Sequence, residues 1–120
     1  MRRLVAILAA LLGMAGLLAG CGGSSSGSTT ASKAKVIHIT FSNGSVTPNG
    51  ERVTVDTGQK VEFVVKADAA GQIHVHSTPE KQLDYNAGTT EIQVGSFAQP
   101  GLIEVESHAL DKTILQLQVR

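Results

Sequence analysis

Cysteine is nearly absent from this sequence, because Cys21 is the only one among its 120 residues. A single cysteine excludes an intramolecular disulfide, even in an oxidising compartment. If Cys21 is itself consumed by a modification, the rest of the chain has no free thiol. Any metal site there would then have to use imidazole and carboxylate groups.

Aromatic residues are scarce, and neither sign of charge is in large excess. The chain has no tryptophan, one tyrosine and three phenylalanines, which argues against a sugar-stacking site or an aromatic cage. Without Arg2 and Arg3, 8 basic residues face 10 acidic ones, a formal charge of −2. Since no basic patch is present, we expect no nucleic-acid partner and no electrostatic adhesion to anionic lipid.

The first twenty residues have the pattern of an export signal. Arg2 and Arg3 form a short basic region, and 4–18 is an almost unbroken apolar run. That run is shorter than the roughly 20 apolar residues of a spanning helix, which disfavours a membrane-spanning anchor. Leu18-Ala19-Gly20-Cys21 resembles the bacterial lipobox at all four positions. The resemblance implies a signal peptide over 1–20, cleavage before Cys21 and acylation of that cysteine, for instance with palmitate. The alternative is an ordinary signal peptide with a chance cysteine.

A doubly or triply acylated cysteine holds a protein firmly at a membrane. We therefore expect a lipid-anchored, extracytoplasmic protein of the cell envelope. The anchor is followed by a stretch rich in glycine and serine, and 21–35 lacks apolar periodicity. Such a stretch behaves as a flexible coil with a mean span of about 20 Å, which predicts a tether to a domain over 36–120.

Short β-type runs separated by turn signals fill the rest of the chain. Asn43-Gly44 and Pro48-Asn49-Gly50 are turn signatures. The stretch 79–85 is interpreted as a connection. Seven or eight strands without a helix predict an all-β sandwich or barrel. The clearest predicted strands are 36–41, 52–55, 60–67, 72–77, 90–94, 102–107 and 113–119.

Two polar clusters occupy one face of their predicted strands. Side chains alternate along a strand, so His74 and His76 share a face, opposite Ile73 and Val75. On the later strand, the residues opposite the core pair are Glu104, Glu106 and His108. If the two strands are neighbours, three imidazoles meet a carboxylate, a donor set that suits copper or zinc. The alternative is an ordinary solvated strand face, and His38 is interpreted as a plain surface residue.

The stretch 36–120 resembles cupredoxin-like domains, which implies a cupredoxin-like Greek-key β-sandwich. The similarity is carried by the opening stretches 43–48, 53–55 and 58–63, by the Pro100-Gly101 strand at 100–106 and by the last strand at 114–119. In blue-copper members, a ligand cysteine ends the penultimate strand, a histidine follows three residues later, and usually a methionine beyond. The cysteine position falls on Ser107 and the histidine position on Leu110 here, and no methionine follows Met14. Only His74 lies where a copper histidine is expected. Blue-copper electron transfer needs a thiolate and is therefore not expected.

A closer resemblance is to bacterial cupredoxin-like domains that carry His-x-His on one strand and Glu-x-His after the Pro-Gly strand. They are similar to the cupredoxin-like part of periplasmic iron-uptake proteins. His74, His76, Glu106 and His108 fit this pattern. The resemblance implies a shared metal site and leaves its occupant open. Cu(II) is favoured over Zn(II) because affinity for nitrogen-rich sites peaks at Cu(II). Glu106 would be a fourth ligand or would orient a histidine.

Catalysis is not expected. Ser107 and the adjacent His108 point to opposite faces of an extended strand, and no phosphate-binding glycine pattern occurs. The sequence therefore predicts a non-enzymatic, metal-binding lipoprotein. The competing hypothesis is a metal-free sandwich that binds an envelope protein.

Overall fold

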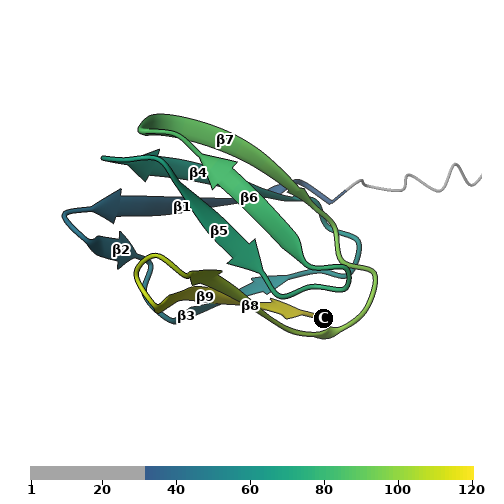
Figure 1. The fold of residues 1–120 in the computed structure, drawn as a ribbon. Coiled ribbons are helices and arrows are strands. Elements are labelled where there is room, and N and C mark those ends of the chain that lie inside the picture. Colours follow the sequence, from purple (N-terminus) through teal and green to yellow (C-terminus); the bar gives the residue numbers. More distant parts are fainter. Residues whose placement is uncertain (1–31) are drawn as a thin grey trace, which may run out of the picture.

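The computed structural model describes residues 32–120, which form a sandwich of two β-sheets (Figure 1). The predicted signal peptide, the lipidated Cys21 and most of the predicted tether lie outside these residues. The first strand begins at Lys35, the last residue assigned to the tether. In the part of the chain that the structure describes, no helix has the length and apolar character needed to cross a membrane.

Nine strands make up the two sheets of residues 32–120. The four-stranded sheet has the order β2-β1-β4-β7, and the five-stranded sheet has the order β3-β9-β8-β5-β6. Their bounds are β1 Lys35–Ser42, β2 Ser45–Thr47, β3 Glu51–Val55, β4 Val61–Ala67, β5 Gly71–Val75, β6 Lys81–Tyr85, β7 Gly88–Gly95, β8 Gly101–Ser107 and β9 Lys112–Val119.

The chain passes repeatedly from one sheet to the other, so most neighbours in a sheet are distant in sequence. β1 lies parallel to β4, β3 lies parallel to β9, and β5 lies antiparallel to β8. Such crossing connections characterise Greek-key sandwiches. The predicted fold class, an all-β Greek-key sandwich, is confirmed, with nine strands where seven or eight were expected.

The core lies between the inner faces of the two sheets and follows from the alternation of the strands. In β1, Ile37, Ile39 and Phe41 are buried while His38 and Thr40 are exposed, as predicted. Burying one such large aliphatic or aromatic side chain contributes about 1.5–3 kcal/mol. The other inward residues, drawn from both sheets, include Val61, Phe63, Val65, Ile73, Val75, Val105, Leu115, Leu117 and Val119.

Two strands were not predicted. β6 occupies much of the stretch interpreted as a connection, and β2 is a three-residue strand after the Asn43-Gly44 turn. β6 pairs with β5 alone and buries only Tyr85, so its sequence carries little apolar alternation. The predicted turn is confirmed, since Asn43 and Gly44 both have positive φ, at 51° and 72°. This is the backbone of a tight hairpin turn whose twist matches the paired strands.

A bulge lies where β8 pairs with β9. Val105 lies opposite Leu115 and Glu106 opposite Thr113, so Ile114 is an extra residue on β9. Ile114 and Leu115 are both buried. A bulge bends its strand and often redirects side chains. Here the extra residue on β9 lies beside Glu106 of β8, one of the residues of the predicted metal site.

Candidate metal site

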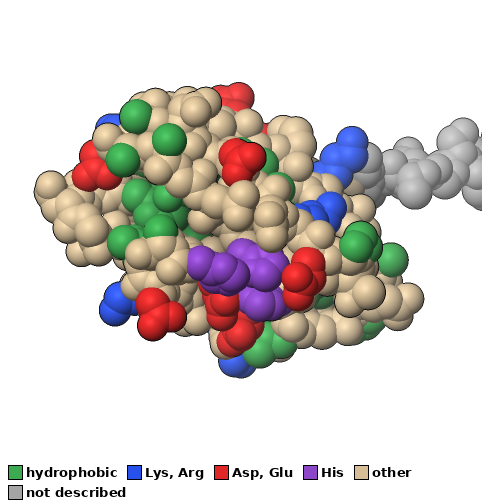
Figure 2. Space-filling model, in the orientation of Figure 1, with side chains coloured by type: hydrophobic (Ala, Val, Ile, Leu, Met, Phe, Trp, Pro, Cys, Tyr) green, Lys and Arg blue, Asp and Glu red, His purple; other side chains and the backbone are tan. Residues whose placement is uncertain are grey.

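The two predicted polar clusters lie side by side in the five-stranded sheet. β5 and β8 are antiparallel neighbours, with His74 directly opposite Glu106 and Val75 opposite Val105. The backbone N–H of His76 donates to the carbonyl of Glu104 at 2.9 Å, which extends the pairing past the end of β5. Tertiary pairing thus brings His74, His76, Glu106 and His108 together, as the sequence predicts if the strands are neighbours. Figure 2 shows histidine side chains gathered with acidic ones on one face of the molecule.

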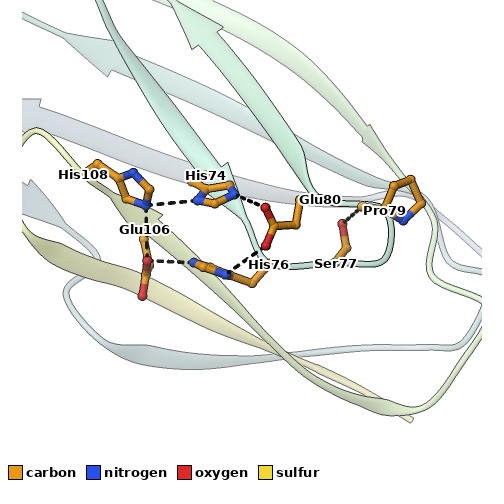
Figure 3. Close-up of polar contacts among 7 residues, drawn as sticks. All are labelled: His74, His76, Ser77, Pro79, Glu80, Glu106 and His108. Atoms are coloured by element: carbon orange, nitrogen blue, oxygen red, sulfur yellow. Dashed lines mark hydrogen bonds and ion pairs between the residues drawn. The ribbon is translucent and has the colours of Figure 1, made fainter.

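Three contacts link the four predicted residues into a chain of close atoms (Figure 3). Nδ1 of His74 lies 3.0 Å from Nε2 of His108. That same His108 nitrogen lies 3.6 Å from Oε2 of Glu106. Oε2 of Glu106 in turn accepts a hydrogen bond from Nε2 of His76 at 2.8 Å. The rings of His74 and His76 are 4.3 Å apart, centroid to centroid.

The burial of the cluster changes from one side to the other. The side chain of His74 is only 11% exposed, whereas that of His108 is 67% exposed. Beneath the cluster, Ile73 and Val75 are fully buried, so the strand that carries His74 is fixed by the core. The site therefore has a rigid inner wall and an outer side open to solvent.

The charges of the cluster favour a protonated His76 and an ionised Glu106. The hydrogen bond that His76 donates to Glu106, reinforced by the negative charges of Glu106, Glu80 and Glu104, raises the pKa of His76 above its ordinary value of 6.5, while desolvation opposes the rise. The same hydrogen bond, with the nearby histidines, lowers the pKa of Glu106 below 4.5. A cation in this cluster would replace the proton of His76.

The arrangement can hold a metal ion. One ligand atom from each of His74, His76, Glu106 and His108 lies within 4.8 Å of the other three. Zinc–ligand bonds of about 2.0–2.1 Å place tetrahedral ligand atoms about 3.3 Å apart, so small side-chain movements close the site. Three imidazoles and a carboxylate suit Zn(II) or Cu(II), and the described residues 32–120 include no cysteine that could add a thiolate.

The other residues named from the sequence lie outside the cluster. His38 is exposed on β1, in the opposite sheet. Glu104 accepts a hydrogen bond from Gln116 at 3.2 Å. Ser107 is buried on the inner face, and its Oγ has no hydrogen-bond partner among the described residues. Leu110 packs against the core from the edge.

One residue of the site was missed. Glu80 lies just before β6, and its Oε2 is 3.1 Å from Nε2 of His74. Its Oε1 is 3.8 Å from Nδ1 of His76. Because the stretch 79–85 was interpreted as a plain connection, nothing suggested that it folds back beside β5. The available signal was a carboxylate four residues after a histidine, followed by a weak strand pattern.

A hollow of about 520 Å³ adjoins the cluster at His76. It is lined by the 77–79 and 96–101 connections together with the start of β8. Phe97, Pro79, Pro100 and the half-exposed Leu102 give it apolar walls. This hollow is a separate surface, since Glu106 and His108 do not line it.

Comparison with known proteins gives a likeness in structure alone. No family model matches the chain, and no curated protein does. One similar solved structure is an oxidised mutant form of amicyanin, with 13% sequence identity and a TM-score of 0.44. The match covers 78% of this chain and 88% of that one. Two proteins at this level of similarity need share no ligand and no activity.

Proposed function

We propose that this protein is a lipid-anchored, non-enzymatic component of the cell envelope that binds a transition-metal ion, with Cu(II) preferred. The ligands are His74, His76 and His108, with Glu106 as the fourth. The ion is captured, buffered or delivered at the membrane surface, without blue-copper electron transfer.

The observation that carries this proposal is the convergence of four ligand atoms within 4.8 Å. They come from β5 and β8 and from the residue that follows each strand, and His76 and Glu106, which share a hydrogen bond, are 30 residues apart in sequence. Such convergence needs a specific strand pairing, which ordinary alternation of polar residues on one strand does not provide. Divalent ions of the first transition row bind such sites with an affinity that peaks at Cu(II), which favours copper over zinc.

The exposure of the site favours exchange over permanent retention. His108 is 67% exposed, so one ligand stands at the solvent boundary. Protein groups supply four donors, and an ion that accepts further ligands can take water or a donor from another molecule. A site of this kind suits capture and transfer of an ion.

Metal titration of a soluble protein comprising residues 32–120 tests the proposal. This range contains all nine described strands and the core between them. Calorimetry with Cu(II) and with Zn(II) should show one ion per molecule, with tighter binding of Cu(II). The double variant His74→Ala/His76→Ala should lose this binding. His38→Ala is the matched control, because it removes an exposed histidine from the other sheet. Absence of tight binding by the unaltered protein, or equal binding by the double variant, would refute the metal site.

The anchor is tested separately, in cells that produce the full chain. Labelling with a palmitate analogue should mark the protein and place it in the membrane fraction. Cys21→Ser should abolish both the label and the membrane association. A labelled Cys21→Ser protein would contradict the anchor while leaving the metal site intact.

The hollow beside His76 favours a second candidate, a metal-free module that binds an envelope protein. Its apolar walls include Phe97 and the half-exposed Leu102. Under this alternative, capture of a partner by the anchored protein would be lost in Leu102→Asp and unchanged in His74→Ala/His76→Ala. The metal-binding proposal instead predicts that metal binding, measured by calorimetry, is lost in His74→Ala/His76→Ala and unchanged in Leu102→Asp.

A further inference from the structure

We propose that Glu80 is a positioning residue for this metal site: its carboxylate fixes the ring nitrogen through which His74 meets the ion. The inference rests on the proposed metal-binding function and adds a residue that the ligand set does not contain. Glu80 does not belong to the four residues whose ligand atoms converge within 4.8 Å.

Each of the two histidines has one nitrogen in the cluster and the other toward Glu80 (Figure 3). For His74, Nδ1 lies 3.0 Å from His108, and Nε2 lies 3.1 Å from Oε2 of Glu80. For His76, Nε2 lies 2.8 Å from Glu106, and Nδ1 lies 3.8 Å from Oε1 of Glu80. One carboxylate thus lies within hydrogen-bond distance of the outer nitrogen of His74 and beyond it from that of His76.

This geometry selects a tautomer. A neutral imidazole carries one N–H donor and one lone pair. An ionised carboxylate only accepts hydrogen bonds, so Glu80 favours the N–H on Nε2 of His74, 3.1 Å away. At His76 the closer acceptor is Glu106, which takes the N–H on Nε2. The lone pair of His74 then lies on Nδ1, the nitrogen inside the cluster. Carboxylates that hold ligand histidines in this way also make them more basic.

The short connection between β5 and β6 returns Glu80 to the histidines. The N–H of Ser77 donates to the carbonyl of Val75 at 2.9 Å, and its hydroxyl donates to the carbonyl of Pro79 at 2.7 Å. Lys81 then pairs with Val75 in the sheet. Glu80 is therefore set opposite His76 by local hydrogen bonds, while its side chain stays 62% exposed. Such an exposed side chain can be replaced with little effect on the fold.

Nuclear magnetic resonance of the Zn(II)-loaded protein of residues 32–120 tests the inference. Long-range proton–nitrogen spectra identify which nitrogen of each histidine binds zinc and which carries a proton. The unaltered protein should bind zinc through Nδ1 of His74, with the proton on Nε2 of the same ring. Coordination through Nε2 of His74 would overturn the inference, because Glu80 would then face the ion as a ligand.

The variant Glu80→Gln keeps the shape of the side chain, but its amide can either accept a hydrogen bond from Nε2 of His74 or donate one to it, so it no longer selects one tautomer. We expect its Zn(II) affinity to fall about 10- to 100-fold. In the metal-free protein, we also expect the single tautomer of His74 to become a mixture. Glu91→Gln is the matched control, since it removes an exposed carboxylate from β7 in the other sheet.

The outcomes separate this inference from the proposed function. A protein that binds neither Zn(II) nor Cu(II) refutes the metal site and the role of Glu80 together. A protein that binds zinc while Glu80→Gln binds it equally well, with unchanged tautomers, refutes the role of Glu80 alone. Weaker binding with mixed tautomers in Glu80→Gln, and neither change in Glu91→Gln, supports both.

Discussion

The two faces of the β5–β8 strand pair share one backbone but carry opposite chemistry. The inner face holds Ile73, Val75 and Val105, all fully buried. The outer face holds imidazoles and carboxylates in contact with one another and with solvent. Since alternate side chains point to opposite sides of a sheet, a single strand supplies both.

The comparison shows how a small sandwich separates stability from ligand binding. The inner face supplies hydrophobic stabilisation, and by fixing the strands it holds the outer side chains at short distances. Functional groups on strands are placed more accurately than groups on loops. Substitutions on the inner face should therefore change the stability of the fold, and those on the outer face should change the affinity for metal.

The largest expected effect is on the inner face. Ile73→Ala should lower the free energy of unfolding by about 2–5 kcal/mol, because it opens a cavity in a fully buried position. For a domain of this size, each kcal/mol lowers Tm by about 4–8 °C, which thermal unfolding followed by circular dichroism measures. Below its transition, the variant should still bind one metal ion. Loss of metal binding in the folded variant would show that the two faces are not separable.

On the outer face, His108→Ala should weaken Cu(II) binding by at least about 100-fold, since even the loss of a group that only supports a ligand costs about 10- to 100-fold. The metal-free Tm should hardly change, because His108 is 67% exposed. Competition with a chelator of known affinity measures the effect. An unchanged affinity would remove His108 from the ligand set.

A smaller effect is expected on protonation. Glu106→Gln should lower the pKa of His76 toward 6.5, because the hydrogen bond that His76 donates to Glu106 is the main cause of its rise. Glu80 and Glu104 also face His76 and would keep part of the shift. The pKa is read from the imidazole proton shifts of the metal-free protein across pH.

The sign of the linked stability follows from the direction of that shift. Because the folded pKa of His76 is raised, protonation favours the folded state below about pH 6.5, and this contribution is lost as the pH rises through the folded pKa. Glu106→Gln should reduce this dependence. An unaltered His76 pKa in the variant would contradict the assigned cause.

The smallest expected effect tests whether the inner face can reach the metal. Ser107 takes the position of the blue-copper cysteine in the resemblance, yet its side chain is only 1% exposed, on the core side of β8. Ser107→Cys should therefore bind Cu(II) as the unaltered protein does, without the intense visible absorption of a copper–thiolate bond. The thiol should also resist modification in the folded protein. Appearance of that absorption would mean that the side chain at position 107 can turn from the inner to the outer face at the end of β8 and reach the metal.

Most of the strands could be predicted because alternation and turns are local properties. Ile37, Ile39 and Phe41 in β1 face the core as the pattern indicates, and the Asn43-Gly44 turn forms. β6 escaped prediction because an edge strand that buries only Tyr85 needs little apolar periodicity. The bulge at Ile114 also escaped, since it depends on how β9 pairs with β8 and not on β9 alone.

The same division applies to the site. The sequence by itself determined which side chains share a face, since the period of a strand places His74 with His76 and Glu106 with His108 whatever the fold. It also limited the chemistry of any metal site in the domain to imidazole and carboxylate, because its one cysteine is Cys21. Only the tertiary structure decided that β5 and β8 are neighbours and that His74 lies opposite Glu106. It alone placed Glu80 behind two histidines. Strand order depends on how two whole sheets bury their apolar faces, a property of all the strands at once that no short segment encodes.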